Sequence, residues 1–588
     1  MLSGFAATNT DAGSFASWHS YTQLNRDEFG NSVLQQAHPA NLPLHQAAWF
    51  PKDAEAEQQQ EEAADDVQFP PSLLQECEQL VSIAGPLFIE GVAAIGEQLV
   101  ATAAVGHLPE PTALPALVMA QAIYNVSGYS IVSGLASALE TLCGQAFGAR
   151  NYHLLPVMLI RAQLVCLLCI LPTIALWGSG SLAWLLPQIG QDPALTVPSS
   201  RLLQLMLPGL LLSIVSETVV QFLLAQGEAV PGMVSSLIGL ALSPGYNIGL
   251  VWGVGAWQGL GLMGAGVAAV AIQGTLVAVL LSYLLYRDCW RAKSAAAQPS
   301  GWQGFSLVEA AQGWASYLAY GLPCVAMVCL EWWVWEVLVL MAGLLPDAET
   351  AVAVMGLSTQ LSLLPWMFCY SLGTATATRV AQALGGGSAL RASRILRMAC
   401  MLVLACSVLL CGGVWLLREP MMAALTRDSS IQQQLKQVLP VVVAAIICDG
   451  QVAVMSGCLR AAGRQGIGAI INWVAYWAFG LPVSWLLGFK LGWGVFGLRW
   501  GLTAAAACQA LVLHWLVACR FDWEEEVRRA KQLVGVDEDA DAGADADAEE
   551  GNAAVATTVV DVAVGAAAAV GVVTDGAAES GLLAPLLQ

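Results

Sequence analysis

Long runs of apolar residues recur along most of this chain, and they limit what it can fold into. The chain has 588 residues, of which 57% are hydrophobic and only 11% are charged. A helix needs ~20 predominantly apolar residues to cross the hydrocarbon core of a bilayer. Because many of the runs reach that length, the sequence predicts an all-α polytopic membrane protein.

Glycine, proline and charged residues divide the apolar runs into twelve candidate transmembrane helices. An even number of spans puts both ends of the chain on the same side of the membrane. The candidates cover approximately residues 79–106, 114–141, 154–178, 200–225, 231–254, 262–286, 315–344, 351–376, 394–417, 437–460, 467–489 and 495–519.

Basic residues near the ends of these helices predict the orientation. With the N-terminus in the cytoplasm, fifteen Lys and Arg residues lie on the cytoplasmic side and six on the other. Cytoplasmic loops normally carry the excess, so we expect both termini in the cytoplasm, with either a plasma membrane or a vacuolar-type membrane as the location. Residues 1–30 lack the pattern of a cleaved signal peptide. The six basic residues expected on the far side are Arg201, Arg418, Arg427, Lys436, Lys490 and Arg499.

The negative charge of the chain is concentrated at its two ends. Of the net charge of −20, residues 1–66 contribute −8 and residues 521–588 contribute −12. Both ends are rich in Asp, Glu, Ala and Gln and lack a periodic apolar pattern. They therefore cannot bury enough surface to offset the entropy of ordering. We expect acidic disordered cytoplasmic tails over residues 1–75 and 521–588.

An internal repeat supports the number of spans. The segment "TLCGQAFGA" at 141–149 aligns with "TRVAQALGG" at 378–386, at an offset of 237 residues. The same offset pairs Pro86 in the first predicted helix with Pro323 in the seventh. Two matches at one offset indicate two six-helix halves, and since six is even these are parallel repeats with a site expected at their interface near mid-membrane. The expected parts are an N-lobe at 76–290, a cytoplasmic loop at 291–313 and a C-lobe at 314–520.

Several acidic residues fall inside the predicted spans, and no lysine or arginine falls in the middle of any of them. An ionised carboxylate in hydrocarbon is costly, so these groups have to face protein or water, and burial favours their neutral form. Groups held in this way can take up and release protons. For Glu97 and Glu217, a neutral packing role is an equally good interpretation. The acidic residues are Glu90, Glu97, Glu217, Glu331, Glu336 and Asp449.

Two of these carboxylates share the seventh predicted helix. Glu331 and Glu336 are five residues apart, which separates them by roughly 140° around a helix. We therefore expect one buried proton site and a second carboxylate that faces a cavity or a neighbouring helix. Pro323 lies two turns before Glu331 and removes a backbone hydrogen bond, which gives the helix a place to bend.

Three tryptophans accompany this pair of glutamates. Trp332, Trp333 and Trp335 could anchor the helix at the membrane interface, as tryptophan often does. Alternatively, they could form an aromatic wall that binds flat or cationic organic molecules by stacking and by cation–π attraction. A nearby carboxylate would strengthen the second arrangement.

Five motifs, taken in order, resemble the multidrug and toxic compound extrusion (MATE) family, in particular its plant and algal branch. The resemblance covers approximately residues 76–520. The motifs are "SGLASALETLCGQAFGARNY" at 133–152, "FLLAQGEAVPG" at 222–232, "GLPCVAMVCLEWWVWEVLVLMAGLLP" at 321–346, "TRVAQALGGG" at 378–387 and "CDGQVAVMSGCLRAAGRQGIGAIINWVAYWAFGLP" at 448–482.

The resemblance implies a V-shaped pair of six-helix lobes that exports organic solutes against a cation gradient by alternating access. It also implies that Glu331 and Asp449 are the proton-linked pair of the C-lobe, with Glu336 as a second acidic position. The aspartate that many prokaryotic members carry in the first helix is not evident, and Glu90 and Glu97 are the possible N-lobe acidic site. Pro86 and Pro323 are candidate hinges.

The family motifs also single out residues at the cytoplasmic ends of the second and tenth helices. We expect a structural or gating role for them rather than substrate binding. Arg460 and Arg464 could cap the last carbonyls of the tenth helix, which we rank first, or could bind acidic groups of the other lobe. The residues of this signature and gating set are Glu140, Gln145, Gly148 and Arg460.

The expected function is a proton-coupled antiporter of organic cations or secondary metabolites, which acts as a monomer without a cofactor. The alternatives are a citrate-type organic-acid exporter and a sodium-coupled antiporter of the same fold. We expect no enzyme activity, metal site or nucleic-acid partner. The histidines are scattered, and the fifteen cysteines mostly lie in apolar runs without metal-ligand spacing.

Overall fold

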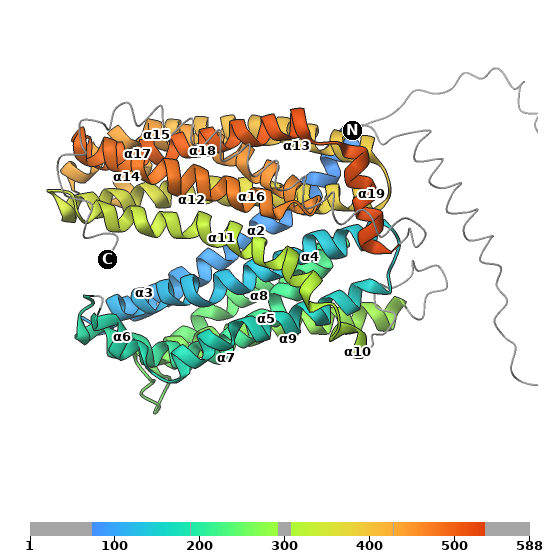
Figure 1. Cartoon of the computed structure of the whole chain (residues 1–588). Coiled ribbons are helices and arrows are strands. Elements are labelled where there is room, and N and C mark those ends of the chain that lie inside the picture. Colours follow the sequence, from blue (N-terminus) through green and yellow to red (C-terminus); the bar gives the residue numbers. More distant parts are fainter. Residues whose placement is uncertain (1–72, 189, 292–306, 427, 536–588) are drawn as a thin grey trace, which may run out of the picture. The chain divides into compact units, whose positions relative to one another are not determined.

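The computed structural model describes residues 73–188, 190–291, 307–426 and 428–535 (Figure 1). Within these ranges every regular element is a helix. The expected N-terminal tail before residue 73, most of the expected inter-lobe loop and the C-terminal tail after residue 535 lie outside the described residues.

Eleven helical segments are long and apolar enough to cross a membrane. Several are interrupted by π-helical turns (η), where one extra residue is accommodated in a helical turn. The eleven segments are α2 (Leu73–Gly106), α5 (Leu154–Gly178), α7 (Pro193–Ala225), α8 with η2 (Val230–Asn247, Ile248–Trp252), α9 (Leu262–Arg291), α11 (Trp314–Ala342), α12 (Ala348–Gly385), α13 (Ala389–Leu416), α15 (Ser429–Ala461), the series α16, η3, α17 and η4 (Gln465–Asn472, Trp473–Gly480, Leu481–Trp485, Leu486–Lys490), and α18 (Gly494–Arg520).

The second predicted span is divided into three elements. They are α3 (Ala113–Tyr124), the π-helical turn η1 (Asn125–Tyr129) and α4 (Ser130–Gly148), which follow one another without a break. With this segment the prediction of an all-α protein with twelve transmembrane helices is confirmed. The shorter helices are α6 (Leu182–Gln188), α10 (Leu307–Ala310), α14 (Arg418–Leu425) and α19 (Trp523–Val534).

Helix α19 corrects the expectation that the chain is disordered from residue 521 onward. Asp522 caps its first turn by accepting hydrogen bonds from the backbone N–H groups of Glu524 and Glu525. Gly535, in the left-handed conformation with φ of 72°, follows its last turn. Its buried residues recur at helical spacing, so the expectation was wrong for this helix: Glu526, Val527, Ala530 and Val534.

The first helix of each half contacts both halves. Helix α2 packs against α8 of its own half and also against α12 of the other half. Helix α11, its counterpart in the repeat, packs against α4 of the N-lobe. Accordingly, Tyr317 and Cys324 of α11 belong to the N-lobe core, while Leu80 and Ile83 of α2 belong to a core formed mainly by C-lobe helices.

The repeat is also evident where α4 and α12 pack against each other. A Cβ atom at Gly148 would lie 2.8 Å from the carbonyl carbon of Gln382, and one at Gly385 would lie 2.7 Å from that of Gln145. Each glycine of the repeated motif therefore packs against the backbone of the other motif's glutamine. We call the end of the molecule that holds this crossing the joined end, and the positive-inside bias predicts that it faces the cytoplasm.

Candidate functional site

A cavity of about 700 Å³ lies between the two halves. Helices α2, α3, α4, α7, α8 and α9 with η1 line it from the N-lobe, and α11, α12 and α15 line it from the C-lobe. All six acidic residues that the sequence places inside spans lie on its wall, whereas its lining contains no Lys, Arg or His. The cavity is therefore acidic, and it brings together residues that are far apart in the chain.

Glu331 and Asp449 contribute to the C-lobe side of the cavity. They come from α11 and α15 and lie near enough for their charges to repel. Glu331 is half-buried, whereas Glu336 is exposed on the cavity wall one and a half turns further along α11. The backbone of α11 is fixed beside this pair because Trp477 Nε1 donates a 2.9 Å hydrogen bond to the carbonyl of Leu330.

The three tryptophans of α11 all line the cavity. The ring of Trp332 stacks on Tyr129 of the N-lobe, with centroids 6.2 Å apart and planes 25° apart. Tyr129 in turn stacks on Tyr124 at 6.4 Å. Trp332, Trp333 and Trp335 thus contribute to an aromatic wall that spans both lobes.

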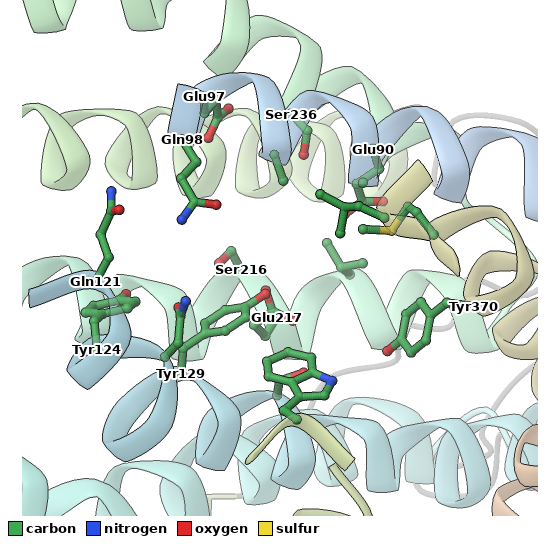
Figure 2. Close-up of a pocket in the computed structure, with 18 of the residues that line it drawn as sticks. Glu90, Glu97, Gln98, Gln121, Tyr124, Tyr129, Ser216, Glu217, Ser236 and Tyr370 are labelled. Atoms are coloured by element: carbon green, nitrogen blue, oxygen red, sulfur yellow. The ribbon is translucent and has the colours of Figure 1, made fainter. Parts of the chain in front are cut away.

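Tyr129 and Glu217 form a pair on the N-lobe side (Figure 2). The hydroxyl of Tyr129 donates a 2.9 Å hydrogen bond to Glu217 Oε1. The π-helical turn η1, which ends at Tyr129, places this ring beside α7. Sequence reasoning left Glu217 undecided and did not select Tyr129, because nothing in the local sequence shows that residues 88 positions apart meet.

Glu90 and Glu97 lie on α2, on the opposite wall from Glu217 (Figure 2). Both carboxylates face glycines of α8, and a Cβ atom at Gly232 would lie 2.6 Å from Glu90 Oε2. Among the described residues, Glu90 Oε2 and Glu97 Oε1 are buried atoms without a hydrogen-bond partner. The predicted N-lobe carboxylates therefore share one face of α2 and reach the same cavity.

Arg499 was counted among the six basic residues near helix ends on the far side of the membrane, and it does lie in the first two turns of α18. The sequence did not show that this residue is buried: it is only 3% exposed, inside the C-lobe. Its Nη2 donates to the carbonyl of Ser358 at 2.9 Å and to Ser362 Oγ at 3.3 Å. Because Arg499 lies near the N-terminal end of α18, the sequence alone does not show that its side chain points into the lobe.

Arg460 joins the two lobes at the joined end. Its Nε donates a 2.9 Å hydrogen bond to Glu140 Oε2 of α4, and the Glu140 side chain is almost fully buried. The hydroxyl of Thr141 donates to the carbonyl of Arg460, and Gln145 Nε2 donates to that of Ala461 at 2.8 Å. Our first-ranked interpretation of Arg460 as a helix cap was wrong, and the alternative of a contact with the other lobe is correct.

Arg464, for which capping was also ranked first, pairs with the buried Glu526 of α19. The guanidinium donates to Glu526 Oε1 from both Nη2, at 2.8 Å, and Nε, at 3.1 Å. Burial outweighs this attraction and raises the pKa of Glu526 to about 7. At the other end of α19, Asn151 Nδ2 donates to the carbonyl of Val534 at 3.2 Å, so the helix contacts both lobes.

Pro86 and Pro323 lie inside α2 and α11, respectively. These are the helices that contact both halves of the protein. No group of three or more His, Cys, Asp or Glu side chains in the described part of the chain could hold a metal ion.

Comparison with known proteins identifies the family. The family profile named MatE matches residues 86–248 and 323–486, one match in each half. The chain belongs to the MATE family. Its members are transporters rather than enzymes, and the two matches coincide with the two repeats found in the sequence.

Relatives in plants and animals share most of the chain. Protein DETOXIFICATION 14 of Arabidopsis thaliana is 31% identical over 79% of this chain and 92% of its own length. Multidrug and toxin extrusion protein 1 of Oryctolagus cuniculus is 29% identical over 78% of this chain and 77% of its own length. These similarities support the predicted plant-like MATE transporter and its place as a multi-pass membrane protein.

Solved structures support the fold. The crystal structure of the eukaryotic MATE transporter AtDTX14 superposes with a TM-score of 0.71 at 29% identity, covering 79% of this chain and 99% of that chain. The MATE transporter VcmN of Vibrio cholerae in its bent form gives a TM-score of 0.65 at 18% identity and covers 78% of this chain and 99% of that chain. The predicted arrangement of two six-helix lobes is thereby confirmed.

Proposed function

We propose that this MATE transporter exports organic cations in exchange for protons. The observation that carries the proposal is the interlobe cavity, whose wall combines six carboxylates with aromatic rings and contains no basic side chain. Aromatic faces attract organic cations, and carboxylates strengthen that attraction. The name of the rabbit relative, Multidrug and toxin extrusion protein 1, agrees with such a substrate class.

Glu331 and Asp449 are the proposed coupling pair, with Glu336 as an auxiliary carboxylate. A carboxyl group enclosed by apolar and aromatic neighbours is easier to hold protonated than ionised, and water entering the cavity reverses that preference. Protons and organic cations then compete for the same negative charge. Each ligand favours one conformation only by its difference in affinity for the two.

Alternating access is proposed to separate the lobes at the joined end. The contacts that would have to break there are the salt bridge between Arg460 and Glu140 and the crossing of Gly148 and Gly385 with the opposite helix. A further ion pair lies at the same end, where Arg391 of α13 contacts the buried Glu76 of α2 at 3.1 Å. Pro86 and Pro323 are the proposed hinges, because they lie in the two helices that contact both halves.

A citrate-type exporter is a weaker candidate, since an anion would enter a cavity lined by six carboxylates without a basic side chain. Sodium coupling would use the same carboxylates. We also propose that the protein acts as a monomer and without a cofactor. We place it in a plasma membrane or a vacuolar-type membrane, with both termini in the cytoplasm.

Transport into proteoliposomes tests the proposal. An imposed pH gradient should drive uptake of tetraethylammonium, whereas a sodium gradient or citrate as the solute should give no comparable flux. Glu331→Gln and Asp449→Asn should each abolish the gradient-driven flux at wild-type abundance. Glu419→Gln is the matched control, because Glu419 pairs with Lys436 outside the cavity. Full proton-driven flux in either coupling variant would contradict the assignment.

A further inference from the structure

Arg499 is a buried positive charge one layer behind the cavity wall. Its guanidinium carbon lies 5.0 Å from the centroid of the Trp335 ring, and Trp335 faces the cavity. One of its two hydrogen-bond acceptors, Ser362, lines the cavity as well. The positive charge of Arg499 therefore acts on the cavity, although Arg499 itself does not line it.

The environment of Arg499 requires a negative charge nearby. Its hydrogen-bond partners in the described part of the chain are a backbone carbonyl and a hydroxyl, which are dipoles and not anions. Holding a buried guanidinium without a counter-charge costs several kcal/mol. Asp449 is the acidic residue near enough for its charge to attract Arg499. The two are not in direct contact, so each stays available to other partners.

The charge balance of the C-lobe site then involves three groups, because Arg460, the other cation that acts on Glu331, is neutralised by its salt bridge to Glu140. Glu331 and Asp449 supply two negative charges when ionised, and Arg499 supplies one positive charge. Glu336 is exposed and therefore solvated. Three other titratable groups interact electrostatically with Asp449: the phenol of Tyr476 and the thiols of Cys369 and Cys448. Phenols and thiols are neutral near pH 7, so these groups do not change the charge of the site.

We propose that Arg499 is a built-in counter-charge that sets the exchange at one proton for one monovalent organic cation. With Arg499 present, the empty site carries a net charge of about −1, so a single proton or a single monocation neutralises it. Without Arg499 the same site carries about −2 and takes two protons or a dication. This inference rests on the proposed function, because it concerns the ratio of an exchange that the function assumes.

The first test is a rescue experiment in proteoliposomes with tetraethylammonium. Asp449→Asn leaves Arg499 without its counter-charge, so the site is neutral when Glu331 is ionised and no longer attracts the substrate. Adding Arg499→Met restores a net charge of −1. Tetraethylammonium uptake by the double variant should exceed that of Asp449→Asn by at least about tenfold, the effect of roughly one pKa unit of interaction between neighbouring charges.

The second test is electrical. In the wild-type protein, exchange of one proton for tetraethylammonium moves no net charge, so a potassium diffusion potential should leave the flux unchanged. Arg499→Met should exchange two protons for one tetraethylammonium, and its flux should then depend on the imposed potential. Arg499→Lys keeps the charge and should remain insensitive to the potential.

A matched control separates charge from packing. Arg418 lies 4.9 Å from the centroid of the Trp415 ring, a similar cation–π pair outside the cavity. Arg418→Met should neither rescue Asp449→Asn nor change the response to potential. If Arg499→Met does not accumulate, the double variant and Arg499→Lys still decide the question.

The results distinguish this inference from the proposed function. If the wild-type protein shows no uptake driven by a pH gradient, the proposed function fails. If the wild-type protein transports, but the double variant is no better than Asp449→Asn or Arg499→Lys responds to potential, the role of Arg499 is refuted and the coupling pair is unaffected.

Discussion

The crossing of α4 and α12 provides a direct test of how the lobes move. Gly148→Ala would place a Cβ atom 2.8 Å from the carbonyl carbon and 2.9 Å from the Cα atom of Gln382. Nonbonded carbon atoms prefer ~3.5–4.0 Å, so the two helices have to separate. Gly385→Ala would likewise place a Cβ atom 2.7 Å from the carbonyl carbon and 2.8 Å from the Cα atom of Gln145.

The size of the effect follows from two opposing contributions. Overpacking of this kind typically costs ~1–3 kcal/mol, and the cost falls only on the conformation in which the joined end is closed. Alanine also favours a helix over glycine by ~1 kcal/mol, but α4 and α12 remain helical in both conformations, so that gain cancels. The equilibrium should therefore shift by about 5- to 150-fold toward separated lobes.

Hydrogen exchange measured by mass spectrometry can detect this shift. In Gly148→Ala and Gly385→Ala, backbone amides at the ends of α4 and α12 should exchange faster than in the wild-type protein, and transport should fall. Gly356→Ala is the matched control, because Gly356 lies on α12 and its Cβ would meet no atom within 4 Å. Wild-type exchange and wild-type transport in both test variants would refute the reasoning.

Three further predictions concern other contacts. Burial raises the pKa of Glu526 from 4.5 to about 7. Its contribution to the docking of α19 is therefore fully present below pH 4.5 and is lost as the pH rises through about 7. Protection of α19 from proteolysis should decline over this pH range, and Glu526→Gln should abolish the decline. Arg460→Ala leaves Glu140 buried and unpaired, so thermal unfolding should show a loss of ~3–5 kcal/mol, and a loss under ~1 kcal/mol would contradict the buried salt bridge. Gly232→Ala should displace Glu90 and reduce transport if this carboxylate takes part; unchanged transport would assign Glu90 a packing role.

The architecture was largely predictable because it follows from patterns that are local in sequence. Apolar runs of bilayer length gave the spans, and one repeated motif with a constant offset gave the two halves. The same motif identified Gly148 and Gly385, whose backbone contacts make the crossing of α4 and α12 possible. Long-range pairing was less accessible, since no local signal places Tyr129 beside Glu217.

Two features were missed for a common physical reason. Helix α19 was overlooked because its charged residues dominated its composition, although its buried residues recur at helical spacing. Arg499 was counted only as a basic residue near the end of the last span, and its burial inside the lobe was not foreseen. In both cases average polarity was used where the direction of individual side chains decides burial.

The duplication preserved the scaffold of this protein and not its chemistry. At the offset of 237 residues that relates Gly148 to Gly385, Glu331 corresponds to Ala94 and Asp449 to Leu212. Close contact between α4 and α12 requires a small residue on both helices, so both halves retain the glycine. The carboxylates face no such requirement, and the N-lobe carries Glu90, Glu97 and Glu217 on the wall of the same cavity at positions that the repeat does not relate to Glu331 and Asp449. The repeat therefore keeps the crossing of α4 and α12 in both halves, while the positions of the acidic groups differ between the halves.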